Sequence, residues 1–278
     1  MKPYRRRGKK IVFVLFACTI ILFVYSICIE RYLLINKNIN ISLKGHASKT
    51  LRIVQFSDTH VGDFFSAEQL KKVVNKINKQ SPDLVFFTGD LFDIMEEYKK
   101  IDEVMIELSK IKASIGKFAI MGNRDYQYGV NFFKEKMKIS GFKILDNKSI
   151  DIAYNNKKIS IYGVSNWVSG PSMTNEVFDN IDKNNLNLLL MHEPDVMNNY
   201  TKYPIDIAFA GHSHGGQVSL PVIGAIIKTN YCEDYFKGKY RLENSRGTIF
   251  NVSSGIGNTK VPFRLGNIPE IITFNINL

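Results

Sequence analysis

The chain has 278 residues, of which 45% are hydrophobic and 23% are charged, and its formal net charge is +11. This composition is close to the globular average and excludes a chain that is disordered throughout, while the length suffices for one large domain or two small ones. Of only three cysteines, Cys18 and Cys28 fall in an apolar run, so a framework of disulfide bonds is excluded as well.

The positive charge is concentrated at the amino terminus, where basic residues precede the first apolar run. Farther along, Lys alternates with Glu and Asp, as in the stretch from Glu96 to Lys112, which is typical of solvated helix faces. The sequence shows no clear nucleic-acid groove, because no basic stripe with interleaved aromatic residues is present. The basic residues at the amino terminus are Lys2, Arg5, Arg6, Arg7, Lys9 and Lys10.

Residues 11–29 form an unbroken apolar run of 19 residues. A helix rises about 1.5 Å per residue, so this run can cross the roughly 30 Å hydrocarbon layer of a bilayer. We therefore predict a transmembrane signal-anchor helix over 11–29. A cleavable secretory signal is the alternative, but the run is longer than the usual apolar stretch of about 7–15 residues, and no Ala-x-Ala site follows it.

The distribution of basic residues predicts how the chain is oriented. Residues 1–10 carry more basic residues than the segment after the run, which has Arg31 and Lys37, so a cytoplasmic tail over 1–10 is expected. The chain is then a single-pass protein of the cell membrane, with the lipid bilayer as a partner and its folded domain outside the cytoplasm. The Asn- and Lys-rich residues 30–50 are predicted to be a linker, and the folded domain is expected over 51–278.

Strands and helices alternate through the folded domain, and polar residues follow each strand. A helix is predicted after the capping-box pattern of Ser66 and Gln69, and another over about 98–114. In alternating β and α sequences, ligands bind outside the carboxyl ends of strands, so the loops that follow the strands are expected to converge. The predicted strands cover 51–57, 83–88, 118–121, 186–191 and 205–210, and the polar residues after them are Asp58 and His60, Asp90, Asn123, His192, and His212 with His214.

Histidine is concentrated in these loops. Four of the five histidines follow a predicted strand, whereas His46 falls in the predicted linker and is not expected to bind a ligand. Imidazole together with carboxylate suits zinc, iron or manganese, and an all-oxygen set would suit magnesium or calcium. The sequence therefore predicts a transition-metal site and leaves the identity of the metal open.

Taken in order, these residues resemble the signature of the calcineurin-like metallophosphoesterase family. The resemblance covers residues 51–278 and implies a four-layer αββα sandwich, here preceded by one transmembrane helix, with two divalent metal ions at one edge of the central sheets. Sequences near the carboxyl terminus, such as Pro262-Phe263-Arg264, are similar to a membrane-associated bacterial branch of the family. The blocks that carry the resemblance are Asp58-x-His60, Gly89-Asp90-x-x-Asp93, Gly122-Asn123, His192 and Gly211-His212-x-His214.

The resemblance also implies a dinuclear site in which Asp90 bridges the two ions. A shared carboxylate reduces the repulsion between two cations about 3.5–4 Å apart. The ions would polarise the phosphoryl oxygens and lower the pKa of a bridging water, and the resulting hydroxide would attack phosphorus in line. The residues implied to hold one ion are Asp58, His60, Asp90 and His214, and those implied to hold the other are Asp90, Asn123, His192 and His212.

One block departs from the family pattern, because many relatives have His after the Gly-Asn pair, whereas this chain has Gly122-Asn123-Arg124-Asp125. A guanidinium does not readily give up a proton, but its fixed fork binds phosphate oxygens and stabilises charge on a leaving group. We therefore predict Arg124 as a catalytic residue beside Asp90. The block is similar to that of UDP-2,3-diacylglucosamine diphosphatases, whose leaving group is itself a phosphate. An ion pair between Arg124 and Asp125 is the structural alternative.

The sequence thus predicts a membrane-anchored, metal-dependent phosphohydrolase whose substrate is a phosphorylated small molecule or lipid, with a lipid- or nucleotide-linked diphosphate as the expected form. The alternatives are a general phosphodiesterase or nuclease, which would need a basic groove with stacking aromatics, and a catalytically silent membrane-bound binding protein, which would be free to lose ligands. Asp93 and Asp125 are expected to orient ligand histidines or to form turns. The oligomeric state is left open.

Overall fold

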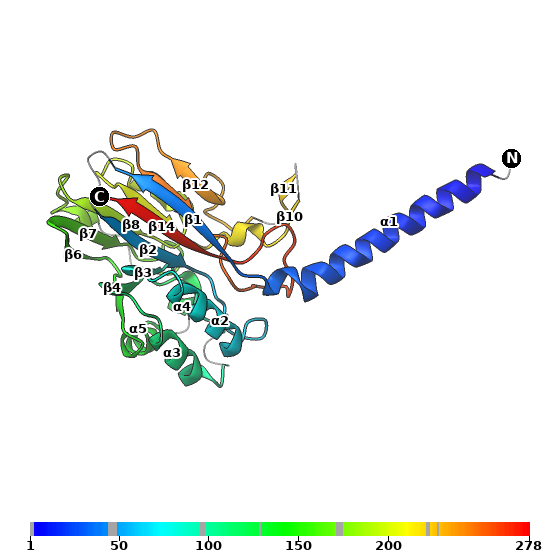
Figure 1. The fold of residues 1–278 in the computed structure, drawn as a ribbon, viewed down its shortest axis with the longest axis horizontal. Coiled ribbons are helices and arrows are strands. Elements are labelled where there is room, and N and C mark those ends of the chain that lie inside the picture. Colours follow the sequence, from blue (N-terminus) through cyan, green and yellow to red (C-terminus); the bar gives the residue numbers. More distant parts are fainter. Residues whose placement is uncertain are drawn as a thin grey trace.

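The structure is a computed structural model that describes residues 3–43, 49–94, 98–127, 129–170, 175–220, 223–226 and 228–278, with side chains from Gly8 onward. His46 and Lys2 lie outside the described residues, as do the side chains of Arg5, Arg6 and Arg7. The described chain consists of one long helix and a layered α/β body (Figure 1).

Helix α1 (Pro3–Cys28) projects from the body as a rod (Figure 1) and includes the predicted span except Ile29, together with most of the basic tail. The segment Gly8–Tyr32 is long and apolar enough to cross a membrane, and only 6% of its most apolar 18-residue window is buried. Such a helix serves either as a membrane anchor or as a signal sequence.

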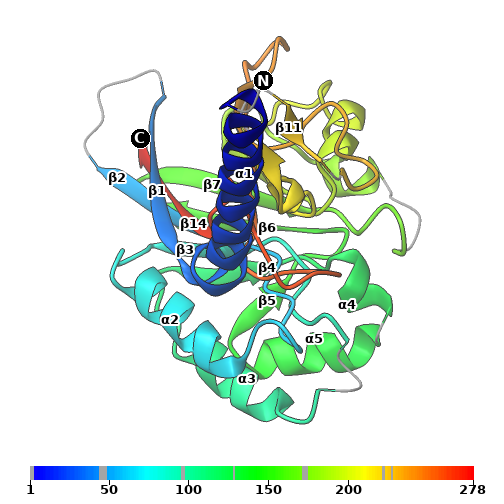
Figure 2. The same ribbon diagram turned by 90° about the vertical axis from the view of Figure 1, so that its right-hand side faces the viewer.

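The first sheet has six strands in the order β1-β14-β2-β3-β4-β5, and three helices cover one of its faces (Figures 1 and 2). Strands β2 to β5 run parallel, β14 is antiparallel to β2, and β1 is parallel to β14. The strands are β1 (Ile35–Ser42), β14 (Glu270–Asn277), β2 (Thr50–Phe56), β3 (Leu84–Phe87), β4 (Gly116–Ala119) and β5 (Phe142–Ile144), and the helices are α2 (Ala67–Asn78), α3 (Ile101–Ser109) and α5 (Val130–Ile139).

Strand β1 corrects the prediction of a linker over 30–50. A 3-10 helix η1 (Glu30–Tyr32) follows α1, and all eight residues of β1 then pair with β14. In the segment INKNINIS, Ile35, Ile39 and Ile41 share one face with Lys37, and Ile39 and Ile41 reach the core between the sheets. The strand could not be recognised from the sequence, because Lys37 interrupts its period of two and its high content of Asn favours turns.

The second sheet has six strands in the order β12-β13-β9-β8-β7-β6 and packs face to face on the first. Its outer face carries the 3-10 helices η2 (Asn175–Phe178) and η3 (Pro194–Asn199), which pack on a third apolar cluster, so the predicted layered α/β fold is confirmed with 3-10 helices in its fourth layer. The strands are β12 (Gly238–Arg241), β13 (Ile249–Val252), β9 (Ile207–Ala210), β8 (Leu186–Leu190), β7 (Lys157–Gly163) and β6 (Lys148–Tyr154).

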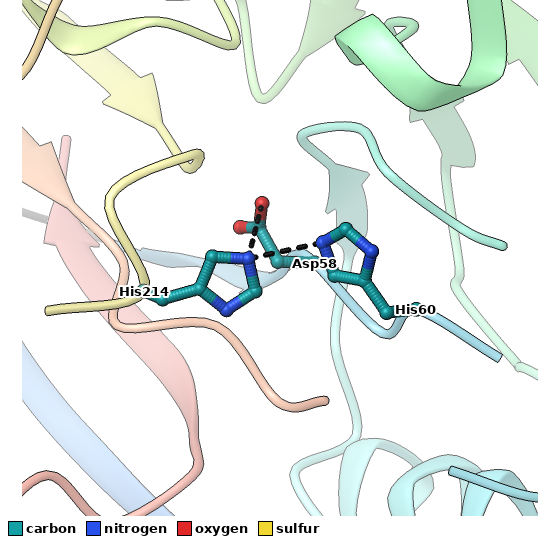
Figure 3. A group of neighbouring side chains, drawn as sticks. All are labelled: Asp58, His60 and His214. Carbon is teal, nitrogen blue, oxygen red and sulfur yellow. Dashed lines mark hydrogen bonds and ion pairs between the residues drawn. The ribbon is translucent and has the colours of Figure 1, made fainter. Parts of the chain in front are cut away.

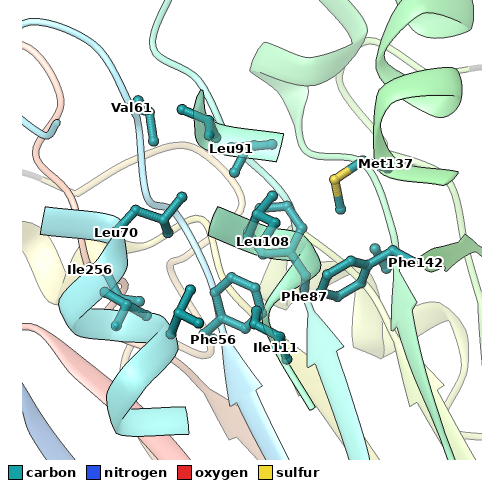
Figure 4. Close-up of a cluster of buried hydrophobic side chains, with 14 of the residues drawn as sticks. Phe56, Val61, Leu70, Phe87, Leu91, Leu108, Ile111, Met137, Phe142 and Ile256 are labelled. Atoms are coloured by element: carbon teal, nitrogen blue, oxygen red, sulfur yellow. The ribbon is translucent and has the colours of Figure 1, made fainter. Parts of the chain in front are cut away.

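Alternation along the central strands divides the core into layers. In β2, Ile53 faces the second sheet, whereas Val54 faces the helices. Figure 4 shows the layer on the helix side, where Phe56 and Phe87 pack against Leu70 and other apolar side chains of the helices. Both faces of β2 and β3 are buried, as is usual for parallel strands, so the carboxyl ends of these strands have a fixed position.

Two short elements complete the body. Helix α4 (Asn123–Gln127) follows β4, and a small hairpin is formed by β10 (Ser219–Leu220) and β11 (Gly224–Ala225). The predicted capping box is confirmed at the start of α2, because the Gln69 amide donates to Ser66 Oγ at 3.3 Å while the Ser66 amide donates to Gln69 Oε1 at 3.0 Å.

We predict that a fragment beginning at Leu51 is less stable than one beginning at Glu30. The shorter fragment leaves the edge of β14 unpaired and exposes the apolar surface that Ile41, 3% exposed, covers. The midpoint of thermal unfolding is expected to fall by roughly 5 °C or more. Amide hydrogen exchange should quicken in β14 and stay unchanged in α5, which serves as the internal control. Equal midpoints and equal exchange in β14 would show that β1 contributes nothing to stability.

Candidate metal centre

All seven predicted ligands lie at one edge of the two sheets, where the carboxyl ends of the parallel strands meet. The loop after β2 provides two of them, the loop after β3 one, and the first residue of α4 one. The other three come from the second sheet, after β8 and β9. In this order the residues are Asp58, His60, Asp90, Asn123, His192, His212 and His214.

Asp58, His60 and His214 form the first cluster (Figure 3). All three side chains are buried, and their ligand atoms lie within 4.8 Å of one another. The Nε2 atoms of His60 and His214 are 3.0 Å apart, and Asp58 Oδ1 is 3.8 Å from His214 Nε2. This cluster can hold one cation through two imidazoles and a carboxylate.

Asp90, His192 and His212 form the second cluster, whose ligand atoms also lie within 4.8 Å of one another. His192 Nε2 is 3.2 Å from His212 Nδ1, and Asp90 Oδ2 is 3.5 Å from His192 Nε2. The same oxygen is 3.5 Å from His60 Nε2 in the first cluster. Asp90 therefore reaches both clusters from a position between them.

The facing ring nitrogens of His192 and His212 show that a cation fits the second cluster. His192 Nδ1 is 2.7 Å from the Thr88 carbonyl oxygen, and His212 Nε2 is 3.1 Å from that of Asn230. Each ring donates a hydrogen bond to its carbonyl through one nitrogen. The other nitrogens, His192 Nε2 and His212 Nδ1, face each other, and one proton or one cation between them would satisfy both lone pairs. Carbonyl partners of this kind orient histidine ligands in metal sites.

Asn123 supplies a second test of fit. Its Oδ1 atom is buried and accepts no hydrogen bond from any described residue. An unpartnered buried amide oxygen costs free energy, and coordination of a cation satisfies it without adding negative charge. The donor set of imidazole, carboxylate and amide therefore fits divalent metal ions, and it suits manganese, iron or zinc.

The candidate ligands differ in protonation, so some of them can bind a metal ion directly and others must first lose a proton. Burial and the neighbouring His192 lower the pKa of His212 to about 3, and burial together with His60 holds the pKa of His214 well below its ordinary value. Both rings are therefore neutral near pH 7. At Asp90, burial is outweighed by His192, His60 and His212 together, and the pKa of the carboxyl group is lowered. At His192, burial is outweighed by Asp90, Asp58 and Glu193 together, and the pKa of the ring is raised, so a metal ion must displace its proton.

The backbone of the ligand loops is held in an uncommon conformation. Five of the seven candidate ligands have positive φ, which is rare for residues other than glycine and clusters at functional sites. Gly122 allows the loops to approach closely, because a Cβ atom there would lie 2.2 Å from Asp90 Oδ1. The φ values are 52° for Asp58, 42° for His60, 59° for Asp90, 67° for His212 and 51° for His214.

Asp125 orients backbone rather than a histidine. Its buried carboxylate accepts hydrogen bonds from the amides of Asp90 at 2.8 Å, Leu91 at 3.0 Å and Gly122 at 2.9 Å. Burial and the nearby Asp90 carboxylate raise the pKa of Asp125 to about 7. Asp125 therefore fastens the loop after β3 to the loop after β4, which sets the position of Asp90.

Arg124 lies at the rim of the site. Its amide donates to Asp90 Oδ1 at 2.8 Å, and its guanidinium reaches Gln127 Oε1 at 3.4 Å. Among the described residues, no ion pair joins Arg124 to Asp125. Asp93 lies as expected for a residue that orients a ligand histidine, because its Oδ1 is 3.5 Å from His60 Nδ1.

A group of buried side chains behind His214 could not be predicted from the sequence. Arg264 is fully buried and donates to the Gly257 carbonyl at 3.1 Å, and its Nη2 lies 3.4 Å from His214 Nδ1. The side-chain amide of Asn267 donates to the His214 carbonyl, and the backbone amide of Asn267 donates to Glu30 Oε1 at 2.6 Å. In the sequence, Arg264 stood out only as part of Pro262-Phe263-Arg264. Its burial could not be predicted, because a charged side chain becomes buried through packing between distant segments.

Comparison with known proteins agrees with this geometry. Residues 51–216 match the model of the family described as calcineurin-like phosphoesterase. The uncharacterized metallophosphoesterase YkuE of Bacillus subtilis is 35% identical over 238 residues, which cover 84% of this chain and 82% of the relative. UDP-2,3-diacylglucosamine pyrophosphatase LpxG of Chlamydia muridarum is 26% identical over 62% of this chain and 65% of its own length.

Solved structures show the same fold. A 5'-nucleotidase precursor from Thermus thermophilus superposes with a TM-score of 0.52 at 13% identity, over 81% of this chain and 55% of that one, so this chain spans about half of its length. The family match, the similar relatives and the two clusters of metal-binding side chains all indicate a metal-dependent phosphoesterase. The chain therefore belongs to the calcineurin-like phosphoesterase family and is a metal-dependent phosphohydrolase.

Proposed function

We propose that the chain is a membrane-anchored dinuclear phosphohydrolase that cleaves a lipid- or nucleotide-linked diphosphate. The position of Asp90 is the main support, since its Oδ2 lies 3.5 Å from His60 Nε2 and 3.5 Å from His192 Nε2. A carboxylate that reaches two ligand clusters is what a bridge between two cations requires. When bound, the two ions supply Lewis acidity toward phosphoryl oxygens and toward a coordinated water.

The side chains of the site divide the remaining tasks. Asp58 and Asp90 provide negative charge to compensate the cations, and Asn123 contributes an oxygen without further charge. The carbonyl groups of Thr88 and Asn230 fix the tautomers of His192 and His212, which leaves the ligand nitrogens free of protons when metal is bound. The reaction then needs no nucleophile from the protein itself.

Arg124 supports a diphosphate substrate. Its backbone amide donates to Asp90 Oδ1 at 2.8 Å, so the residue begins directly beside the metal centre. A guanidinium binds two phosphate oxygens at once and remains charged, which suits a leaving group that departs as a phosphate and needs no strong acid. LpxG is named as a pyrophosphatase of a lipid-linked UDP sugar, and this similarity favours the same class of bond.

The amino-terminal helix supports a location at the cell membrane. In this proposal α1 remains uncleaved, its basic end stays in the cytoplasm, and the catalytic domain lies outside it. A general phosphodiesterase is the second candidate, because the same pair of candidate metal sites would activate water toward a phosphodiester bond equally well. A silent binding protein is disfavoured by the intact set of candidate ligands.

Replacement of the bridging carboxylate tests the metal centre. We expect Asp90→Asn in the full chain to lower metal-dependent hydrolysis of bis-p-nitrophenyl phosphate about a hundredfold or more, because a neutral amide cannot bridge two cations. Bound metal, measured by mass spectrometry after loading with manganese, iron or zinc, should fall while circular dichroism stays unchanged. Asp151→Asn, at an exposed ion pair with Lys158, is the control and should behave as the unchanged chain. Full activity of Asp90→Asn, or activity that survives a chelator, would refute the assignment.

Replacement of Arg124 tests the substrate. For Arg124→Ala, we expect hydrolysis of a UDP-linked diphosphate to fall about 10²–10³-fold with little change in bound metal, since a donor to the phosphate is lost. Arg124→Lys should recover part of the rate through its charge. A parallel loss of metal would mean that Arg124 is structural, and a preference of the unchanged chain for bis-p-nitrophenyl phosphate over the diphosphate would favour the phosphodiesterase.

A further inference from the structure

The metal centre and helix α1 lie at the same edge of the sheets. Strand β1 begins soon after α1 and runs parallel to β14, which runs antiparallel to β2. Ile35, at the start of β1, pairs with Glu270, and two residues later in β14 Ile272 pairs with Gln55, near the end of β2. The edge that carries the metal ligands is therefore the edge from which α1 leaves the body (Figure 1).

The end of α1 is packed on the body rather than tethered to it. The Arg264 amide donates to the Ser26 carbonyl at 3.3 Å, and Arg31 Nη1 donates to the Pro262 carbonyl at 2.7 Å. The rings of Phe23 and Phe263 lie 6.2 Å apart. These contacts fix the direction of α1 relative to the loop 262–267, which also supports His214.

Hairpin β10–β11 is attached to the same loop. The Ser219 amide donates to the Leu265 carbonyl at 2.8 Å, and the Leu265 amide donates to the Gln217 carbonyl at 3.0 Å. The hairpin projects on the side from which α1 leaves (Figures 1 and 2). It carries Ile223 and Ile226, whose side chains are 74% and 58% exposed, and Lys228 next to it is exposed as well.

We propose that hairpin β10–β11 is a second membrane contact, in which Ile223 and Ile226 enter the interfacial layer of the bilayer beside α1. Apolar side chains flanked by lysine are typical of segments that lie in this layer. The bilayer is the expected occupant because the hairpin is joined through the loop 262–267 to the helix that spans it. This inference rests on the proposed function only in that α1 remains as an anchor.

Site-specific fluorescence in the full chain tests the inference. Ile223→Cys is introduced with Cys18→Ser and Cys28→Ser, while the buried Cys232 is kept, and the new thiol is labelled with the environment-sensitive dye NBD. In vesicles of phosphatidylethanolamine and phosphatidylglycerol, we expect blue-shifted emission and at least twofold quenching by lipids with a spin label in the head-group region. Ile226→Cys is the second position, and Ile139→Cys on α5, at a side chain that is 66% exposed, is the control.

The outcomes separate this inference from the proposed function. If the chains stay in the membrane fraction after a carbonate wash but the dye at positions 223 and 226 emits as it does at position 139, the hairpin contact is overturned. The proposal of an anchored enzyme is then unaffected. Release of the chain by the wash overturns both the anchor and the contact. Circular dichroism of each labelled chain, compared with that of the unchanged chain, shows that the fold is preserved.

Discussion

Facing pairs of imidazole nitrogens impose the constraint on which the rest of this structure depends. His60 and His214 bring their Nε2 atoms to 3.0 Å, and His192 Nε2 lies 3.2 Å from His212 Nδ1. Lone pairs at such distances repel each other, and burial excludes the water that would separate them. A shared proton or cation reverses the repulsion, and the carboxylates of the two clusters balance its charge. Metal binding and the order of these loops are therefore linked equilibria.

The sheets and their supporting side chains make this convergence possible. A left-handed backbone costs roughly 1–2 kcal/mol per residue, and several ligand loops adopt it. The cost is offset because Asp125 accepts hydrogen bonds from three amides of the loops after β3 and β4, and because Arg264 binds the carbonyl groups behind His214. Both groups are buried, so the strain is held by interactions that solvent does not weaken.

The candidate ligands could be predicted from the sequence because their signals are local. Each follows a run of apolar residues that forms a strand, as at Asp58 after β2, and each stands near Gly, Asp or Asn. Strand β1 could not be recognised, because its partner β14 lies at the other end of the chain and its Asn residues favour turns. The support of His214 by Arg264 was equally hidden, since it depends on a charged side chain becoming buried between segments that meet only in the fold.

Strand β1 also decides where the site lies relative to helix α1. A flexible linker would let the domain turn in any direction, but here α1 continues through η1 into a strand of the first sheet, and Glu30 is bound by the Asn267 amide. The Asn267 side chain in turn binds the His214 carbonyl. In the anchored state, the distance between bilayer and metal centre is thus set by the fold. A substrate held in the same bilayer by its own acyl chains then has a high effective concentration at the site, whereas a freely diffusing substrate does not.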